Sequence, residues 1–279
     1  MAVNKVKSTL KYKLVSVDGK TQTRFDYILK KGQTVTIGEY KPIYSGIDTS
    51  NLPDIIFEDE DLLVINKPAG LLSIADNKEK LNTAYHIMNE YVKLKNPNGR
   101  IFVIHRLDKG TSGILMFAKN IEIKSALQDD WENLVTLRGY TALVEGCPER
   151  ESGRIESWLR ETDTMLIYSA RSEGDGKHAI TNYKVARKGD FYTLLDINIE
   201  TGRKNQIRVH MKDIGCPIAG DKKYDAKTNP IHRLALHAGT LSFIHPFTNE
   251  EMYFETQIPK KILTGLKIIP EMKKKSSHR

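Results

Sequence analysis

The segment HRLDKGTSGILMFAKN, at residues 105–120, places a carboxylate where enzymes often place one. An apolar strand delivers His105, Arg106 and Asp108 to a turn that contains glycine and serine, and a second apolar strand leaves it. Functional side chains are often presented on such a loop between rigid strands. Asp108 can act there as a nucleophile or a general base. The alternative is an aspartate that caps the turn and forms a local salt bridge, for example with Lys109.

A second segment, TGRKNQIRVHMKDIGCPIAGD at residues 201–221, concentrates basic side chains within ten residues. These are Arg203, Lys204, Arg208, His210 and Lys212. A helix over 204–214 would place Lys204, Arg208 and Lys212 on one face. Like charges on one face reduce stability, so we expect an anionic partner or a buried carboxylate for Arg208. The alternative is a solvated cationic helix face.

Motifs for cofactors and metal ions are missing from the sequence. It contains no P-loop, no GxGxxG after a strand and no GxSxG elbow. His232, His237 and His245 lie near one another, but no HExxH motif accompanies them, which favours packing or hydrogen-bonding roles over a metal site. Cys147 and Cys216 have neither the density of a disulfide scaffold nor metal-ligand spacing. Two reduced thiols predict a cytoplasmic protein.

The positive charge of the chain gathers at its two ends. The net charge is +8 over 279 residues, and residues 1–50 hold nine Lys/Arg against four Asp/Glu. Residues 260–279 hold seven against one. A near-neutral body with cationic ends favours a polyanionic partner, although exposed lysines also serve solubility. No apolar run is long enough to span a bilayer, and no secretory signal is present.

The pattern of strands and helices predicts an α+β protein. Hairpin signals recur, for example at Asp18-Gly19, and few strands alternate with helices, which favours a mostly antiparallel sheet. Strands are expected at 62–66, 102–105, 113–119 and 140–146, and helices at 83–94, 121–131 and 204–214. Three parts are expected: a small β-rich extension at 1–50, one large domain at 51–270 and a basic tail at 271–279.

Five segments, taken in order, resemble the blocks of the RluA family of RNA pseudouridine synthases. They are DLLVINKPAGLLS, HRLDKGTSGILMFAK, RGYTALVEG, GRKNQIRVHMKDIGCPIAGDKKY and RLALHAGTLSFIHPFT. The resemblance covers residues 54–257. It implies an α+β pseudouridine synthase fold, with a mixed, mainly antiparallel sheet and a central active-site cleft, in the catalytic domain at 51–270. The chain departs from the family pattern at Lys204-Asn205, where Thr-His is commoner, and at Gly110, where an acidic residue is more usual.

The resemblance also implies roles for single residues. Asp108 corresponds to the essential catalytic aspartate, and Arg106 corresponds to the arginine that helps to evert the target nucleotide. Tyr140 corresponds to the tyrosine that packs on the target base and can accept a proton at carbon five. Arg208 corresponds to the arginine that pairs with the aspartate.

Three further side chains of the same blocks are expected to bind RNA or to assist nucleotide flipping: His105, Arg203 and Lys204. No cofactor and no metal ion are expected. Residues 1–50 resemble only the β-hairpin half of the RNA-binding module that many relatives carry. Their positive charge favours RNA binding, and the missing helices of that module argue against it.

The implied function is the isomerisation of a specific uridine to pseudouridine in structured RNA, either rRNA or tRNA, by a monomeric enzyme. The alternative is a catalytically silent RNA-binding or ribosome-assembly protein on the same fold, which the presence of Asp108, Tyr140 and Arg208 argues against. A glycosidase is a third hypothesis, and the resemblance assigns no second acid to work with Asp108. The target uridine stays open, as does the choice between nucleophile and base for Asp108.

Overall fold

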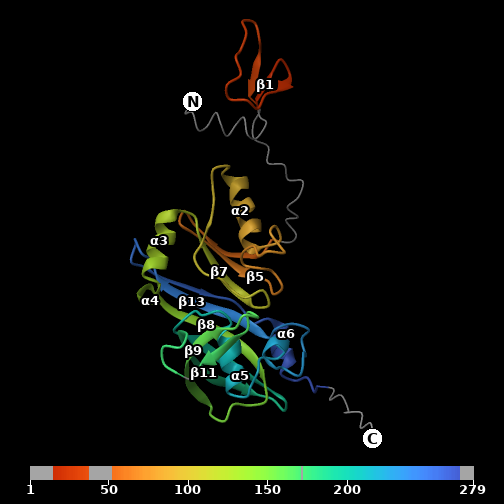
Figure 1. Ribbon diagram of the computed structural model, residues 1–279, viewed down its shortest axis with the longest axis vertical. Coiled ribbons are helices and arrows are strands. Elements are labelled where there is room, and N and C mark those ends of the chain that lie inside the picture. The colour runs from red at the N-terminus through yellow and green to blue at the C-terminus, as the bar shows by residue number, and fades with distance from the viewer. Residues whose placement is uncertain (1–14, 38–51, 171, 271–279) are drawn as a thin grey trace.

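The computed structural model describes residues 15–37, 52–170 and 172–270. Its strands form a three-stranded sheet near the N-terminus and an eleven-stranded sheet in the rest of the described chain (Figure 1). In the larger sheet the pairing of β13 with β7 is parallel and the other pairings are antiparallel. The predicted α+β class with a mixed, mainly antiparallel sheet is therefore confirmed. None of the described helices is long and apolar enough to cross a membrane.

The strands of the larger sheet follow the order β10-β9-β11-β12-β8-β13-β7-β5-β4, with β14 beside β13 and β6 beside β7. Their bounds are β4 Asp54–Glu58, β5 Leu62–Lys67, β6 Phe102–Val103, β7 Ser112–Ala118, β8 Val135–Glu145, β9 Ser152–Glu161, β10 Ile167–Ala170, β11 Lys177–Lys188, β12 Tyr192–Ile199, β13 Leu236–Ile244 and β14 Glu251–Glu255. The helices are α2 Ala84–Lys95, α3 Ile121–Asp129, α4 Trp131–Leu134, α5 Gln206–Asp213 and α6 Lys260–Gly265, with a 3-10 turn at Lys222–Tyr224.

The small sheet contains β1 (Val15–Val17), β2 (Lys20–Thr21) and β3 (Val35–Ile37). Asp18 and Gly19 connect β1 to β2 with positive φ angles of 51° and 78°, as the predicted tight turn requires. The sequence over 27–37 predicts a second turn at Gly32 followed by a β-branched run. The structure has a turn at Gly32, with a φ of 93°, and the strand β3 after it. The predicted domain boundary at residue 50 and the basic tail at 271–279 lie outside the described residues.

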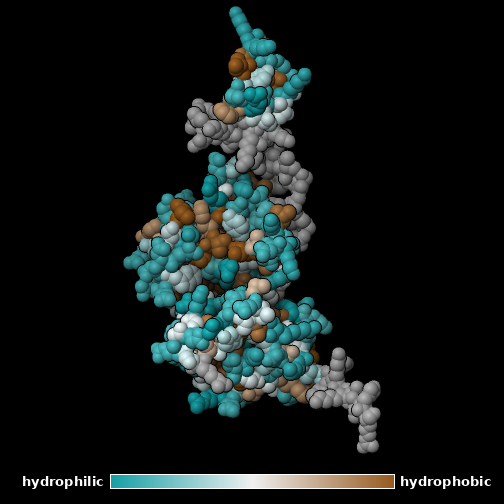
Figure 2. Space-filling view, in the orientation of Figure 1, coloured by the Kyte–Doolittle hydropathy of each residue, from teal (hydrophilic) through white to brown (hydrophobic). Residues whose placement is uncertain are grey.

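Strands β5 and β7 are buried on both faces because a helix covers each face. Side chains alternate along a strand, so Leu62 joins a cluster with Leu127 of α3, while Leu63 joins a second cluster with Met88 of α2. This double burial explains the continuous apolar runs in both strands. Elsewhere the face in Figure 2 is mostly hydrophilic, with a hydrophobic patch between α2 and α3 in that view.

Three predicted element ends differ from the structure. Strand β6 stops at Val103, so His105 lies in a loop and not on a strand. The helix expected over 121–131 is broken at Asp130, whose φ of −123° and ψ of 31° are not helical. Strand β8 starts at Val135, five residues before the expected start, so Tyr140 lies in mid-strand.

Small residues bring three central strands close together below the HRLD segment. In the strand register, Ala238 of β13 pairs with Tyr140 of β8 and with Gly113 of β7. Gly113 has a φ of 118°, and a Cβ on it would lie 2.0 Å from the carbonyl oxygen of Ala238. Only glycine fits this close approach. The pairing of β7 with β13 therefore depends on Gly113.

We expect Gly113→Ala to lower the free energy of unfolding by roughly 3 kcal/mol or more, because it combines a strained φ with backbone overlap. Gly146→Ala is the matched control, since Gly146 has a φ of 71° and nothing within 4 Å of an added Cβ. The control should lose only about 1–2 kcal/mol from its backbone strain. Chemical denaturation of both variants makes the comparison. Equal losses would contradict the close packing of β7 on β13.

Candidate active site

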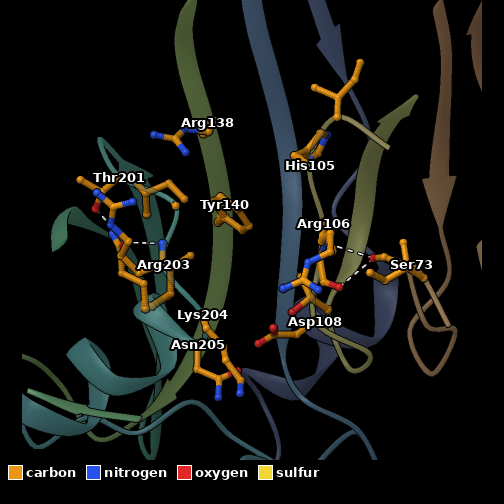
Figure 3. Close-up of a pocket in the computed structure, with 18 of the residues that line it drawn as sticks. Ser73, His105, Arg106, Asp108, Arg138, Tyr140, Thr201, Arg203, Lys204 and Asn205 are labelled. Carbon is orange, nitrogen blue, oxygen red and sulfur yellow. Dashed lines mark hydrogen bonds between the residues drawn. The ribbon is translucent and has the colours of Figure 1, made fainter. Parts of the chain in front are cut away.

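A cleft of about 740 Å³ opens over the middle strands of the larger sheet. Four segments line most of it: the HRLD loop (residues 104–111), residues 72–76, the middle of β8 with Arg138 and Tyr140, and residues 199–208 (Figure 3). The cleft thus gathers the two segments that the sequence singled out for chemistry. Its volume lies in the range of ordinary ligand pockets, roughly 300–1,000 Å³.

Hydrogen bonds fix the HRLD loop on both sides of Asp108. The buried Ser73 hydroxyl accepts from the N–H of Leu107 at 3.0 Å and donates to the carbonyl of Leu107 at 2.7 Å. The N–H of Gly70 donates to the carbonyl of Lys109 at 2.7 Å. The segment after β5 therefore holds Asp108 in place from outside its own loop.

Asp108 and Arg208 form an ion pair at the bottom of the cleft. Nη1 of Arg208 donates to Oδ2 of Asp108 at 3.1 Å, and the Asp108 side chain stays 30% exposed. No described residue hydrogen-bonds the second oxygen, Oδ1. The pair predicted from the resemblance is present in the structure, with one carboxylate oxygen left for a ligand.

A second carboxylate holds Arg208 more tightly than Asp108 does. Nε and Nη2 of Arg208 donate to the two oxygens of Asp221 at 2.7 and 2.8 Å, and the Asp221 side chain is 2% exposed. The guanidinium also donates to Asn205 at 2.9 Å and lies 4.9 Å from the ring centre of Tyr224. Burial disfavours the charge of Arg208, but the hydrogen bonds and charge of Asp221, followed by Asp108, raise its pKa overall.

Asn205 explains why the predicted helix over 204–214 starts later than expected. Its φ of 56° and ψ of 17° are left-handed, so α5 begins at Gln206. Lys204 consequently lies before the helix, and its ammonium pairs with Glu161. The expected shared face of Lys204 and Arg208 is wrong. The expected carboxylate partner for Arg208 is present.

Tyr140 projects from β8 into the cleft between Arg138 and Asp108 (Figure 3). Burial, with a smaller contribution from the charge of Asp108, raises the pKa of Tyr140 to about 12, while Arg138 opposes the shift. The side chain is therefore a neutral phenol at physiological pH. It offers a ring face and a hydroxyl group to a ligand.

His105 is a neutral ring in the wall of the cleft. Burial, assisted by the charge of Arg138, lowers the pKa of His105 to about 4. Its Nε2 accepts from the N–H of Met116 at 3.1 Å, which assigns the proton to Nδ1. His105 thus contributes an aromatic surface rather than a positive charge.

Three of the predicted basic residues line the cleft and differ in their exposure and their interaction partners. Arg106 is exposed and has no hydrogen-bond or ion-pair partner among the described residues. Arg203 is fixed, because its Nε donates to the carbonyl of His178 at 2.9 Å. Lys204 is exposed and pairs with Glu161, as described above. Only Arg106 combines charge with freedom to move.

Sequence reasoning missed four residues that shape this site. Asp221 and Asn205 fix Arg208, and Trp131 and Arg138 line the end of the cleft beyond Tyr140. A period of two along β8 could have found Arg138, because residues two apart share a strand face. No local signal indicates that Asp221 returns to Arg208.

A buried cation lies beneath the loop. The ammonium of Lys67 donates to the carbonyls of Pro68 and Leu71 at 3.0 and 2.8 Å. Burial lowers the pKa of Lys67 to about 8, although the charge of Asp108 partly opposes this. Lys67 therefore supports the loop from within the core and cannot reach a ligand.

Two of the three clustered histidines, His237 and His245, have structural roles. His237 is buried and bonds to the hydroxyls of Ser112 at 2.9 Å and Thr256 at 3.0 Å. His245 is also buried, and its Nδ1 accepts from the N–H of Thr248 at 3.2 Å. In the described part of the chain no group of three or more His, Cys, Asp or Glu side chains could hold a metal ion.

The arrangement suits a ligand that combines a ring with negative charge. Asp108 offers one free carboxylate oxygen, Tyr140 offers a neutral ring, and Arg106 offers a mobile cation. A carboxylate fixed by a cation is a suitable nucleophile or general base. Asp221 is not a second acid for such chemistry, because both of its oxygens bind Arg208.

Comparisons with known sequences point to one kind of enzyme. The family described as RNA pseudouridylate synthase matches residues 61–213. The chain is 37% identical over 253 residues to the uncharacterized RNA pseudouridine synthase YlyB of Bacillus subtilis, covering 88% of this chain and 82% of that protein. It is 34% identical over 250 residues to the ribosomal large subunit pseudouridine synthase D of Buchnera aphidicola, covering 83% and 78%.

Comparison with solved structures gives the same fold. Human RNA pseudouridylate synthase domain containing 4 matches with a TM-score of 0.63 at 24% identity, over 76% of this chain and 92% of that one. Human RNA pseudouridylate synthase domain containing 1 matches with a TM-score of 0.58 at 25% identity, over 74% and 83%.

We expect Asp221→Asn to lower the free energy of unfolding by roughly 2–4 kcal/mol, because a buried guanidinium loses its bidentate carboxylate and keeps Asp108 as its one charged partner among the described residues. Asp225→Asn removes the same charge from an exposed pair with Lys212 and is the matched control. The control should cost less than about 1 kcal/mol. Chemical denaturation of both variants gives the two values. A tolerated Asp221→Asn would mean that Arg208 does not depend on this carboxylate.

Proposed function

Since the chain belongs to the RluA family of RNA pseudouridine synthases, we propose that its cleft isomerises one specific uridine in structured RNA, with Asp108 as the reacting carboxylate. Family membership makes the chain an isomerase, as the sequence predicted. The position of Asp108 carries the proposal: one oxygen is held by Arg208, and the other has no hydrogen-bond partner among the described residues and faces the cleft.

The reaction requires little beyond a carboxylate and a shaped cleft. The bond from N1 of uracil to C1′ of the ribose breaks, the uracil turns and C5 bonds to C1′. C5 then loses its proton to a base and water, and N1 takes up one proton. Atoms balance within the nucleotide, so no group is transferred from outside. Asp108 serves as nucleophile or base at the sugar. Arg208 stabilises its negative charge and fixes its direction.

Tyr140 supports the base in this proposal. Its ring lies between Asp108 and Arg138, where a uracil can stack on it (Figure 3). Since its pKa is raised to about 12, the hydroxyl keeps its proton at neutral pH. That favours the stacking role over the predicted role as proton acceptor at carbon five.

Arg106 is suited to the predicted role in nucleotide flipping. A base inside a helix cannot reach Asp108, so the nucleotide must leave the stack. Arg106 is exposed, lies two residues from Asp108 and has no partner among the described residues, so it can fill the vacated space. Flipping costs a few kcal/mol in a helix and less in a loop.

The names of relatives favour one class of RNA substrate. Two relatives are named ribosomal large subunit pseudouridine synthase D, those from Buchnera aphidicola and Zymomonas mobilis. Their names favour rRNA over tRNA among the two predicted substrates. The predicted cytoplasmic location, the monomeric state and RNA binding by residues 1–50 and 271–279 stay predictions.

Asp108→Asn tests the proposal. The substitution is nearly isosteric and removes only the charge and the nucleophilicity, so folding and RNA affinity should persist while isomerisation falls roughly 100-fold or more. Tritium release from RNA labelled at carbon five of uridine measures the reaction. Asp175→Asn, which removes a charge from an exposed pair with Arg160, should leave the rate unchanged. An Asp108→Asn rate within tenfold of the wild-type rate would reject the catalytic role.

A further inference from the structure

The cleft continues past Tyr140 to a second end that the proposed chemistry does not use. Arg138 and His105 lie on opposite sides of this end, away from Asp108 (Figure 3). Trp131, at the start of α4, also lines it. These three side chains determine which ligand this end of the cleft can bind.

The wall of this end is aromatic. The rings of His105 and Trp131 lie 5.6 Å apart at an angle of 40°, and Trp131 is only partly buried. Because His105 is neutral, the pair does not repel a cation or attract an anion strongly. It offers a flat apolar surface of the kind on which nucleic-acid bases stack.

A cation lies next to this aromatic surface. The guanidinium of Arg138 lies 5.9 Å from the ring centre of Trp131 and donates to the carbonyl of Glu200. No carboxylate of a described residue lies within ion-pair distance of it. Glu132, also at this end, is exposed; burial lowers the pKa of Arg138, and the charge of Glu132 opposes that shift. A half-buried cation without a carboxylate partner favours an anionic ligand.

The distance between Arg138 and Tyr140 relates this end of the cleft to the target uridine. Arg138 and Tyr140 are two residues apart on one strand, about 7 Å, and point to the same face. A uracil stacked on Tyr140 therefore has its neighbour in the RNA chain within reach of Arg138 and Trp131.

We propose that Trp131 and Arg138 form a subsite for a nucleotide adjacent to the target uridine, with Trp131 stacking on its base and Arg138 binding its phosphate. The inference rests on the proposed function and goes beyond it, because it assigns recognition of a flanking nucleotide to two named residues. His105 positions the Trp131 ring. Base stacking at this subsite tolerates different bases, so it fixes the register of the RNA rather than its full sequence.

Tryptophan fluorescence tests the stacking directly. The chain has two tryptophans, so Trp158→Phe leaves Trp131 as the only one. The Asp108→Asn substitution in the same protein prevents turnover during the titration. The probe is a set of loop RNAs that contain the target uridine, each with one abasic position on either side of it.

Intact RNA should quench Trp131, and one abasic position should remove the quenching and weaken binding roughly fivefold or more. Equal quenching by every abasic RNA, or no quenching by intact RNA, would overturn the stacking role.

Activity measurements separate this inference from the proposed function. Trp131→Leu should slow single-turnover isomerisation on intact RNA but not on RNA that lacks the flanking base, and Trp131→Phe should restore the rate. Equal slowing on both RNAs would reject the subsite while leaving the enzyme class intact. A wild-type protein without isomerisation would instead reject the proposed function.

The phosphate contact has its own readout. Arg138→Gln should weaken binding and flatten the slope of log affinity against log salt by about 0.7, the value for one phosphate contact on a single strand. Arg160→Gln, which alters an exposed arginine paired with Asp175, is the control and should leave the slope unchanged. An unchanged slope for Arg138→Gln would show that Arg138 does not bind phosphate.

Discussion

Arg208 lies between two carboxylates, and the geometry of the cleft depends on this arrangement. Asp221 takes two of its N–H groups at 2.7 and 2.8 Å, which leaves Nη1 for Asp108 and Asn205. Because Asp221 is buried and Asp108 is partly exposed, the guanidinium is anchored on the core side and acts on the cleft side. One cation thereby connects the core of the protein to the carboxylate of Asp108 in the cleft.

The rest of the fold positions the two sides of this ion pair. Gly113 lets β7 approach β13, and the loop that precedes β7 is held by Ser73 and Gly70. On the other side the left-handed Asn205 starts α5, so that Arg208 emerges one turn later toward Asp108. Neither side carries a complete site. Asp108 lies on the loop before β7, and Arg208 lies on α5, which follows β12. Strands β8 and β13 pair between β7 and β12, and this order of strands places the two side chains at the same cleft.

The sequence predicted the strands and turns around this site better than the contacts between distant segments. The buried strands β5 and β7 were predictable because a strand that is buried on both faces has a continuous run of apolar residues. The turn at Asp18-Gly19 was predictable because its backbone angles demand those residues. The start of α5 was not, since a basic periodic run gives no sign that Asn205 adopts a positive φ. The contact of Asp221 with Arg208 was also not predicted, because the path of residues 214–220 after α5 decides it and no periodicity in the sequence indicates that path.

We infer that Arg208 acts on Asp108 and not on the RNA. Single-turnover isomerisation and RNA affinity, measured together for Arg208→Leu and Arg208→Lys, distinguish these two roles. Arg208→Leu should lower the rate roughly 100-fold and leave the affinity near the wild-type value. Arg208→Lys should keep part of the rate, because the charge stays while the bidentate fork is lost. A dissociation constant raised by orders of magnitude for Arg208→Leu, with the rate at saturating RNA unchanged, would show that Arg208 binds the RNA instead.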